Sequence, residues 1–134
     1  MPKKPKLKLT KVQALFNRAI IERDSRCVIC GRQTSLQCSH FFTVGAHSGL
    51  RFHPDNAHAM CAGCHIKHHQ ADPLMYANWM IMNHWYELYN LDRIKSIPVR
   101  YTQAHLNTIC VFIRAKSWDE LIQYLDLIQQ GREL

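Results

Sequence analysis

Residues 27–69 read CVICGRQTSLQCSHFFTVGAHSGLRFHPDNAHAMCAGCHIKHH, and this stretch decides the fold. It contains two Cys-x-x-Cys pairs, Cys27/Cys30 and Cys61/Cys64, whose inner cysteines are 31 residues apart. Each pair presents two thiolates from one tight turn, and two such turns complete the tetrahedral four-sulfur shell of closed structural zinc sites. Because the stretch is poor in aliphatic side chains, we predict that a structural Zn2+ stabilises it.

Two of the six cysteines lie outside these pairs. Cys110 falls in an apolar run, so we interpret it as a small core residue. Cys38 is either a second core residue or a spectator beside the site described below. The six cysteines therefore divide into four ligands and two bystanders.

Helical periodicity flanks the cysteine-rich stretch on both sides. We predict a helix over residues 11–23, with Thr10 and Gln13 as a capping box. Between the cysteine pairs, short runs such as 36–43 indicate small strands. Asp72 and Pro73 read as the N-cap and first residue of a long helix. Its apolar residues predict one broad inward face, formed by Met75, Trp79, Met82, Trp85 and Tyr89.

The last third of the chain predicts two further helices. Residues 102–116 carry an apolar stripe at helical spacing, although the run 109–113 also fits a buried strand. Ser117 and Glu120 have the spacing of another capping box, and the helix they open is expected to end at Gly131.

A chain of 134 residues with 47% hydrophobic and 20% charged residues fits one globular domain. It has no apolar run of transmembrane length and no segment of signal-peptide type, so we expect no membrane partner and a cytoplasmic location, in the host cell if the chain is phage-encoded. We divide it into a basic tail (1–9), a helix plus zinc module (10–71) and a helical extension (72–134). The extension is expected to pack on the module or to form a homodimer interface.

The net charge of +7 is concentrated in the N-terminal half. Residues 1–11 carry +5, residues 12–71 carry +3, and the remainder carries −1. A basic region of this kind favours a polyanion, most simply DNA. The alternative for the tail is a solubilising segment without a specific partner. The residues that we assign to DNA contact are Lys3, Lys4, Lys6, Lys8, Arg51 and Lys67.

Three polar residues, a histidine, an asparagine and a second histidine, occur in this order between and after the cysteine pairs. His40 closes the segment LQCSH, Asn56 lies in FHPDNAHAMC sixteen residues later, and His65 directly follows the last cysteine. His, Asn and His framed by two Cys-x-x-Cys turns resemble the HNH nucleases of the ββα-metal, or His-Me finger, class. The resemblance implies an α+β fold in which a zinc-stabilised ββα-metal (HNH) module carries flanking N-terminal and C-terminal helices.

The resemblance also implies a role for each of these residues. The histidine at position 40 is the general base that deprotonates the attacking water, a task suited to a neutral imidazole near pH 7. Asn56 braces the loop that holds this histidine. The helix after the second cysteine pair supplies metal ligands, His65 and, four residues on, His69. They bind a catalytic divalent ion, Mg2+ or Mn2+ by expectation, with Zn2+ as the alternative.

One position departs from the HNH pattern. Many members have Asp or His directly before the general base as a further metal ligand, whereas this chain has Ser39. Either water and DNA phosphate complete the shell of His65 and His69, or another side chain joins them. The candidates for that place are His53, Asp55, His58 and His68.

A closer resemblance covers about residues 27–70. The run SHFFTVGAHSGLRFHPDNAHAMCAGCHIKHH is similar to the phage NinG, or Rap, recombination proteins, in which Leu-Arg-Phe, Asp-Asn and a Gln-Cys-x-x-Cys-Asn turn occur in the same order. Those proteins also lack the acidic residue before the base. Membership implies a structure-specific endonuclease acting on branched DNA such as D-loops and Holliday junctions.

Several features admit a plainer interpretation. Arg51 is either a phosphate clamp or the partner of Asp55, and Lys67 is either a DNA contact or a solvated lysine. The aromatic stripe Trp79, Trp85, Tyr86 and Tyr89 is interpreted as core, with stacking on unpaired bases as the alternative.

The function predicted from these observations is metal-dependent hydrolysis of phosphodiester bonds by an HNH endonuclease, on branched recombination DNA. The first alternative is an HNH enzyme of another purpose, such as nicking at packaging sites or restriction. The second alternative is a zinc-ribbon protein that binds DNA without cleaving it, in which Ser39 marks a lost metal site.

Overall fold

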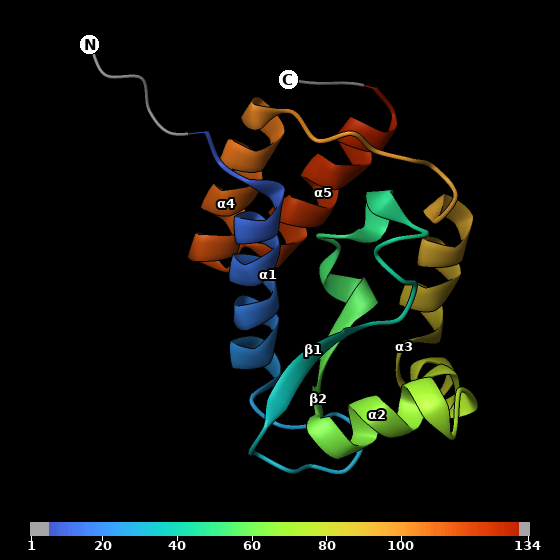
Figure 1. Cartoon of the computed structure of the whole chain (residues 1–134). Helices are drawn as coiled ribbons and strands as arrows, with labels where there is room; N and C mark the ends of the chain where they lie inside the picture. The colour runs from blue at the N-terminus through green and yellow to red at the C-terminus, as the bar shows by residue number, and fades with distance from the viewer. Residues whose placement is uncertain (1–5, 132–134) are drawn as a thin grey trace.

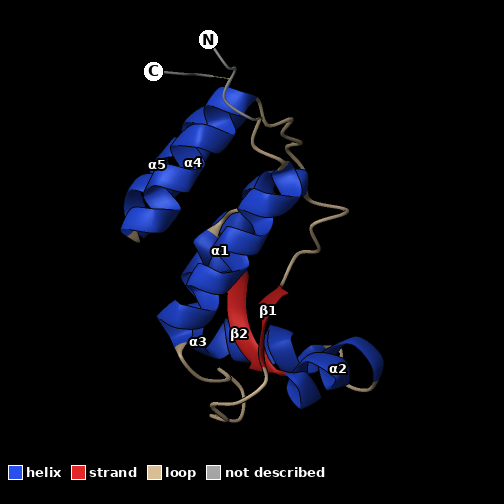
Figure 2. Cartoon of the chain, turned by 60° about the vertical axis from the view of Figure 1, so that its left-hand side comes forward, coloured by secondary structure: helices blue, strands red, loops and turns tan. Residues whose placement is uncertain are grey.

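Two antiparallel strands lie at the centre of the molecule, with helices on both of their faces (Figures 1 and 2). The computed structural model describes residues 6–131. Strand β1 (Leu36–His40) pairs with β2 (Ala57–Cys61) in a register that places Ser39 opposite His58 and His40 opposite Ala57. Helix α1 (Leu9–Asp24) packs on the face that carries His40, since Phe16 stacks on that ring, while α2 (Ala62–Gln70) and α3 (Leu74–Ile94) lie on the other side, where Tyr76 of α3 contacts Ser39 and His58.

The fold is α+β, as the sequence predicted. The loop between the strands contains two short 3-10 turns, η1 (Ser48–Leu50) and η2 (Pro54–Asn56), and α2 follows β2 without a linker. The chain thus runs strand, loop, strand, helix through the cysteine-rich stretch. Within residues 6–131, none of the helices combines the length and the apolar character required to span a lipid bilayer.

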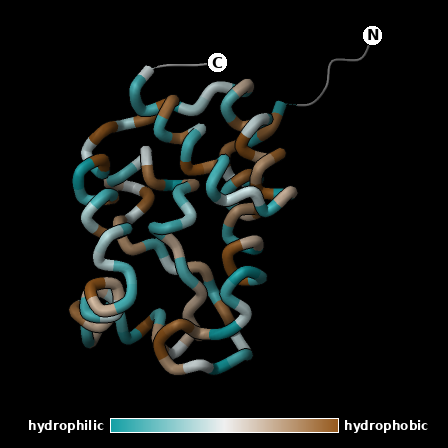
Figure 3. The backbone as a smooth tube through the Cα atoms, turned by 180° about the vertical axis from the view of Figure 1, so that it is seen from behind, coloured by the Kyte–Doolittle hydropathy of each residue, from teal (hydrophilic) through white to brown (hydrophobic). Residues whose placement is uncertain are grey.

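Helices α4 (Gln103–Ala115) and α5 (Trp118–Gln129) pack on the opposite side of α1 from the strands. The alternative of a strand over 109–113 is therefore wrong, because this run lies inside α4. In Figure 3, brown and teal segments alternate along α1, the pattern of a helix with one buried side. The largest buried side chains of this core are Val12, Phe16, Ile20, Phe52, Ile109, Ile113 and Leu121.

The first helix starts earlier than predicted, whereas the last starts at the predicted N-cap, Ser117. Lys8, not Thr10, is the N-cap of α1, and Ser117 is the N-cap of α5 without a side-chain bond, so neither predicted capping box forms. The capping box lies instead on α4, where Thr102 Oγ1 accepts from the His105 N–H and His105 Nδ1 accepts from the Thr102 N–H. The pattern Thr-x-x-His escapes a search for Glu or Gln at the fourth position.

The prediction of one inward apolar face on α3 is wrong. The helix is kinked at His84, whose φ of −142° and ψ of 40° are not helical, so the two halves do not share one face. Tyr76, Met80 and Leu91 are buried, whereas Trp85 is 66% exposed. Periodicity defines which residues share a side of a helix, but not whether another element covers it. The exposed members of the predicted face are Met82, Trp85 and Tyr89, and Tyr86 of the aromatic stripe is exposed as well.

Candidate metal centre and active site

The four paired cysteines meet in one cluster. The Sγ atoms of Cys27, Cys30, Cys61 and Cys64 all lie within 4.8 Å of one another, with Cys30 and Cys61 at 3.6 Å. Four sulfurs at 2.3 Å from a tetrahedral Zn2+ are roughly 3.8 Å apart, so the cluster has the dimensions of a zinc site. The four cysteine sulfurs are therefore suited to hold the predicted structural zinc.

Local backbone geometry prepares these sulfurs for a cation. The Gly31 N–H donates to Cys27 O, and Gly31 has a φ of 81°, which closes the first turn at a conformation that favours glycine. Burial raises the pKa of the Cys27 thiol, but backbone N–H donors of the turns outweigh it and lower that pKa to about 7. Burial and the neighbouring sulfurs raise the pKa of Cys64. Neighbouring thiolates repel one another, and a bound Zn2+ reduces this repulsion because its positive charge offsets part of their negative charge.

His40 stands at the end of β1 with its ring fixed from two sides. The ring stacks on Phe16 of α1 at a centroid distance of 6.0 Å, and its Nε2 lies 3.3 Å from the carbonyl oxygen of Arg51. Because a carbonyl only accepts, Nε2 carries the proton in this arrangement and Nδ1 is the free base. Burial lowers the pKa of His40 to about 4, so the neutral imidazole persists well below pH 7.

Asn56 ties together the loop that follows His40. Its side-chain Oδ1 accepts from the Phe42 N–H at 2.8 Å, and its Nδ2 donates to the carbonyls of Phe42 at 3.0 Å and Leu50 at 3.3 Å. The Phe41 N–H also donates to the Asn56 carbonyl. The side chain is fully buried, so each of these bonds stabilises the loop without competition from water. Asn56 thus occupies a bracing position between the end of β1 and the loop that carries Arg51.

Ser39 lies on the opposite face of β1 from His40 and is fully buried. Its hydroxyl oxygen has no hydrogen-bond partner in the described part of the chain. Its carbonyl accepts from Tyr76 Oη at 3.2 Å, and that tyrosine hydroxyl lies 2.7 Å from His58 Nδ1. An unpaired buried hydroxyl costs free energy, so Ser39 is a locally unfavourable position within the strand.

The histidines of α2 form a contiguous group beside this face. The rings of His65 and His69 are 4.6 Å apart, and those of His68 and His69 are 4.9 Å apart. His65 Nδ1 and His68 Nδ1 are both buried without a partner among residues 6–131. His68 also packs against Tyr76, the residue that bonds Ser39. Imidazoles with unpaired nitrogens are donors that a divalent transition metal accepts.

Two other candidates for the metal shell, His53 and His58, have structural partners. His53 is buried and its Nδ1 accepts from the Asp55 N–H, which caps η2. His58 is held by Tyr76 and packs between Trp79 and His84. Within the described residues, the four cysteines make the one group in which three or more cysteine, histidine or acidic ligand atoms converge. The histidines on α2 therefore require further ligands.

The predicted DNA-contact residues are spread over several elements. Lys6 and Lys8 are exposed directly before α1 and Lys67 is exposed on α2, whereas Lys3 and Lys4 lie outside the described residues. Arg51 makes no ion pair with Asp55 in the described structure, and its Nε is buried without a partner.

Sequence reasoning missed two features that position the site. Arg23 donates to the carbonyls of Pro54 and Ala57, and its neighbour Asp24 accepts from the Ala59 N–H, each at 2.8 Å. The carbonyl of Ala57 and the N–H of Ala59 lie on the edge of β2 that does not face β1. Arg23 and Asp24 at the end of α1 therefore satisfy backbone groups that a third strand would otherwise bond. Tyr76 is the second feature, because it links α3 to both strands. Charged residues at a helix end and a tyrosine in an apolar stripe carry no local signal of such distant contacts.

Comparison with known proteins yields one finding. Residues 3–117 match the family model described as Bacteriophage Lambda NinG protein. No curated protein and no solved structure matches the chain significantly. The matched range extends well beyond the cysteine-rich stretch, because it includes α1, α3 and α4.

Proposed function

The chain belongs to the NinG family, and from this premise we propose that it is a metal-dependent DNA endonuclease of HNH type. The proposed reaction is hydrolysis of a phosphodiester bond. The proposed substrate is branched recombination DNA, such as a Holliday junction or a D-loop, of a phage in the host cytoplasm.

The observation that carries this proposal is the state of His40. The bond from Nε2 to the Arg51 carbonyl leaves Nδ1 as the proton acceptor, and burial keeps the ring neutral at the pH of a cell. In the proposed step, Nδ1 takes a proton from water as the water oxygen bonds to phosphorus, and the bond from phosphorus to the 3′-oxygen breaks. Asn56 keeps the loop carrying Arg51 in register with His40, so that the base retains its tautomer and direction.

His65 and His69 are the proposed ligands of the catalytic ion, and the unpaired Nδ1 of His68 makes it a third candidate. A divalent ion bound there supplies charge stabilisation to the pentacoordinate phosphorus and the leaving oxygen. Ser39 has a hydroxyl where other HNH enzymes have a ligand, and its unpaired oxygen faces the same side of the strands as α2 and α3. The residues present thus favour a site completed by water and substrate oxygen.

The charge distribution supports DNA as the substrate. Lys6 and Lys8 directly precede α1, the helix on the His40 face of the strands, and the acidic excess lies in the last 63 residues. Arg51 has an unpaired guanidinium nitrogen in the loop whose carbonyl holds His40. A phosphate bound by Arg51 would therefore approach the proposed base.

A second candidate function is DNA binding without cleavage. It is favoured by one observation, namely that the α2 histidines are not joined by a third convergent histidine, cysteine or acidic ligand in residues 6–131. In this alternative the zinc cluster is the sole metal site, and His40 is a half-buried structural histidine.

The test is cleavage of three substrates by the zinc-loaded protein: a synthetic four-way junction, supercoiled plasmid and linear duplex, each with Mg2+ or Mn2+. We expect nicking of the junction in preference to the linear duplex. Equal cleavage of both would remove the branched-DNA assignment and leave the nuclease. Binding of all three substrates without cleavage under any divalent ion would establish the second candidate instead.

A further inference from the structure

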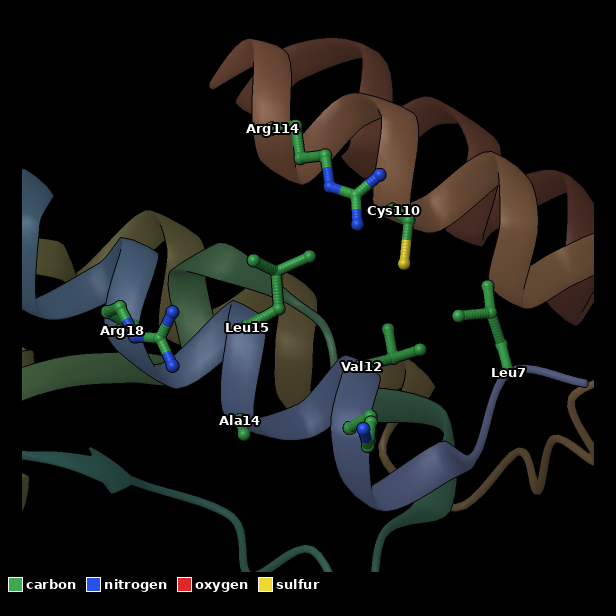
Figure 4. Close-up of a pocket in the computed structure, with 8 residues that line it drawn as sticks. Leu7, Val12, Ala14, Leu15, Arg18, Cys110 and Arg114 are labelled. Carbon is green, nitrogen blue, oxygen red and sulfur yellow. The ribbon is translucent and has the colours of Figure 1, made fainter. Parts of the chain in front are cut away.

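A groove lies between α1 and α4, and its lining includes none of the proposed catalytic or metal-binding residues (Figure 4). It has a volume of about 420 Å3, within the range of sites that hold a small molecule or one unit of a polymer. Val12 and Leu15 of α1 line one side, Leu7 lines it from the segment before that helix, and the Cys110 thiol points into it from α4. Its floor is therefore apolar, whereas its rim carries Lys11, Arg18 and Arg114.

The three cations on the rim have no ion-pair partner in the described part of the chain, and Glu22 lines a neighbouring hollow together with Arg18 and Arg114. Lys11, Arg18 and Arg114 are exposed and form no ion pair within residues 6–131, and no acidic side chain lines the groove. By contrast, Lys116 at the end of α4 is paired with Glu22 at 3.4 Å. Lys11 and Arg18 are seven residues apart, so they lie on one side of α1 about 10 Å apart along its axis. The rim complements an anionic chain rather than a single small anion.

We propose that this groove binds single-stranded DNA, with phosphates on Lys11, Arg18 and Arg114 and a base or sugar against Leu15 and the other aliphatic residues. A duplex presents phosphates and buries its bases in the stack, so it gains nothing from an apolar floor. A single strand exposes both its phosphates and its bases. The lysines at 6 and 8 continue the basic track from the rim toward the N-terminus.

Helix α1 contributes residues both to the groove and to the packing around the proposed base. Phe16 stacks on His40, and the preceding residue, Leu15, lines the groove. A D-loop has an unpaired strand next to duplex arms, whereas a four-way junction is fully paired, so a groove selective for a single strand would favour D-loops among the branched substrates. This inference rests on the proposed function, because it supplies that nuclease with a means of recognising the branch.

The test is fluorescence anisotropy of a labelled 15-nucleotide oligothymidylate and a 15-base-pair duplex with the zinc-loaded full chain, without Mg2+ or Mn2+. For Arg18→Glu and for Arg114→Glu we expect about tenfold weaker binding of the oligothymidylate. The slope of log affinity against log salt should fall by about 0.7 for each phosphate that the variant no longer binds. The matched control is Arg93→Glu, an exposed arginine on α3 with the same change of charge, for which we expect less than about a threefold effect.

A second variant tests the apolar floor. Leu15→Gln should weaken oligothymidylate binding about fivefold and leave duplex binding unchanged, with folding checked by circular dichroism. If the arginine variants bind the oligothymidylate as tightly as the wild type does, the proposal is overturned and an acidic protein segment becomes the better occupant. Equal losses for Arg93→Glu and Arg114→Glu would overturn it as well. Failure of junction cleavage with intact oligothymidylate binding would refute the nuclease and not the groove.

Discussion

The strand region around the four cysteines and the helical core of α1, α4 and α5 are held together in different ways. The helical core is built from interdigitated aliphatic and aromatic side chains, among them Ile20, Ile109 and Leu121. The strand region also has an apolar cluster, which includes Met60, Tyr76 and Met80, but it depends in addition on the sulfur cluster and on individual hydrogen bonds from Asn56 and Arg23. Apolar packing tolerates local change, whereas a metal cluster or a buried amide loses its contribution when one atom is altered.

The difference extends to unsatisfied polar atoms. Of the five buried side-chain atoms without a partner among residues 6–131, four lie in residues 39–68, and the helical core supplies the remaining one, from Gln13. Such atoms cost stability, and they persist where a ligand uses them. The strand region thus contains most of the buried polar atoms that lack a protein partner, and with them the candidate chemistry. The four atoms are Ser39 Oγ, Arg51 Nε, His65 Nδ1 and His68 Nδ1.

The largest effect is expected from Cys61→Ser, which removes one zinc ligand. Zinc content should fall from one ion per chain to near zero, because three thiolates no longer close the shell. Amide hydrogen exchange in β1 and β2 should accelerate at least about 100-fold, while amides of α4 and α5 remain protected. Cys110→Ser is the control, because Cys110 lies in the helical core and should leave the zinc in place. Uniform loss of amide protection across both regions would show that the strand region and the helical core are not stabilised separately.

Ile109→Ala should destabilise the helical core by about 3 kcal/mol, since the side chain is fully buried and the cavity left behind cannot close. Urea unfolding measures this change. Val111→Ala, two residues away on the same helix and 63% exposed, should cost less than about 0.5 kcal/mol. Zinc content should be unchanged in both variants, and loss of zinc from Ile109→Ala would show that the two regions are not separable.

Asn56→Ala should cost about 2 kcal/mol, because it leaves buried backbone groups of Phe42 and Leu50 without partners. If Asn56 braces the proposed base, cleavage should fall further than the loss of folded protein explains. The comparison is made at a temperature where circular dichroism shows both proteins fully folded. A fully folded Asn56→Ala with wild-type cleavage would show that the brace has no part in the reaction.

Acid should destabilise the strand region through its buried histidines. Burial lowers the pKa of His40 to about 4 and that of His58 to about 3, whereas the unfolded chain titrates near 6.5. The stabilisation is complete above pH 6.5 and is lost as the pH falls toward 4, because the unfolded chain binds the proton first. Each such histidine contributes about 1.4 kcal/mol per pH unit in that window. His40→Gln should reduce the measured slope by that amount, and an unchanged slope would contradict the assigned neutral state.

The smallest effect is expected from Trp85→Ser. The side chain is 66% exposed on α3, so the free energy of unfolding should change by less than about 0.5 kcal/mol. Met80→Ala on the same helix, where the side chain is fully buried, is the matched comparison and should cost about 2 kcal/mol or more. A large cost for Trp85→Ser would restore the interpretation of the aromatic stripe as core.

The sequence predicts those parts of the molecule that depend on local chemistry. The spacing within each of the pairs Cys27/Cys30 and Cys61/Cys64 predicts a turn that does not depend on the rest of the fold. The helices that begin at residues 103 and 118 are likewise predicted by their own apolar periodicity. The aromatic face of α3 is mispredicted because the kink at His84 and the exposure of the residues beyond it depend on distant packing. The clamp from Arg23 and Asp24 joins residues 31 to 35 positions apart, which a local pattern does not encode.

The most direct test of the account is single-turnover cleavage of a four-way junction by the wild type and by His40→Gln, both zinc-loaded and folded. If His40 Nδ1 is the general base, the wild type nicks the junction with Mg2+ or Mn2+, and the variant does so about 100- to 10,000-fold more slowly. Equal rates for the two proteins, or no cleavage by the wild type with either ion, would contradict the account.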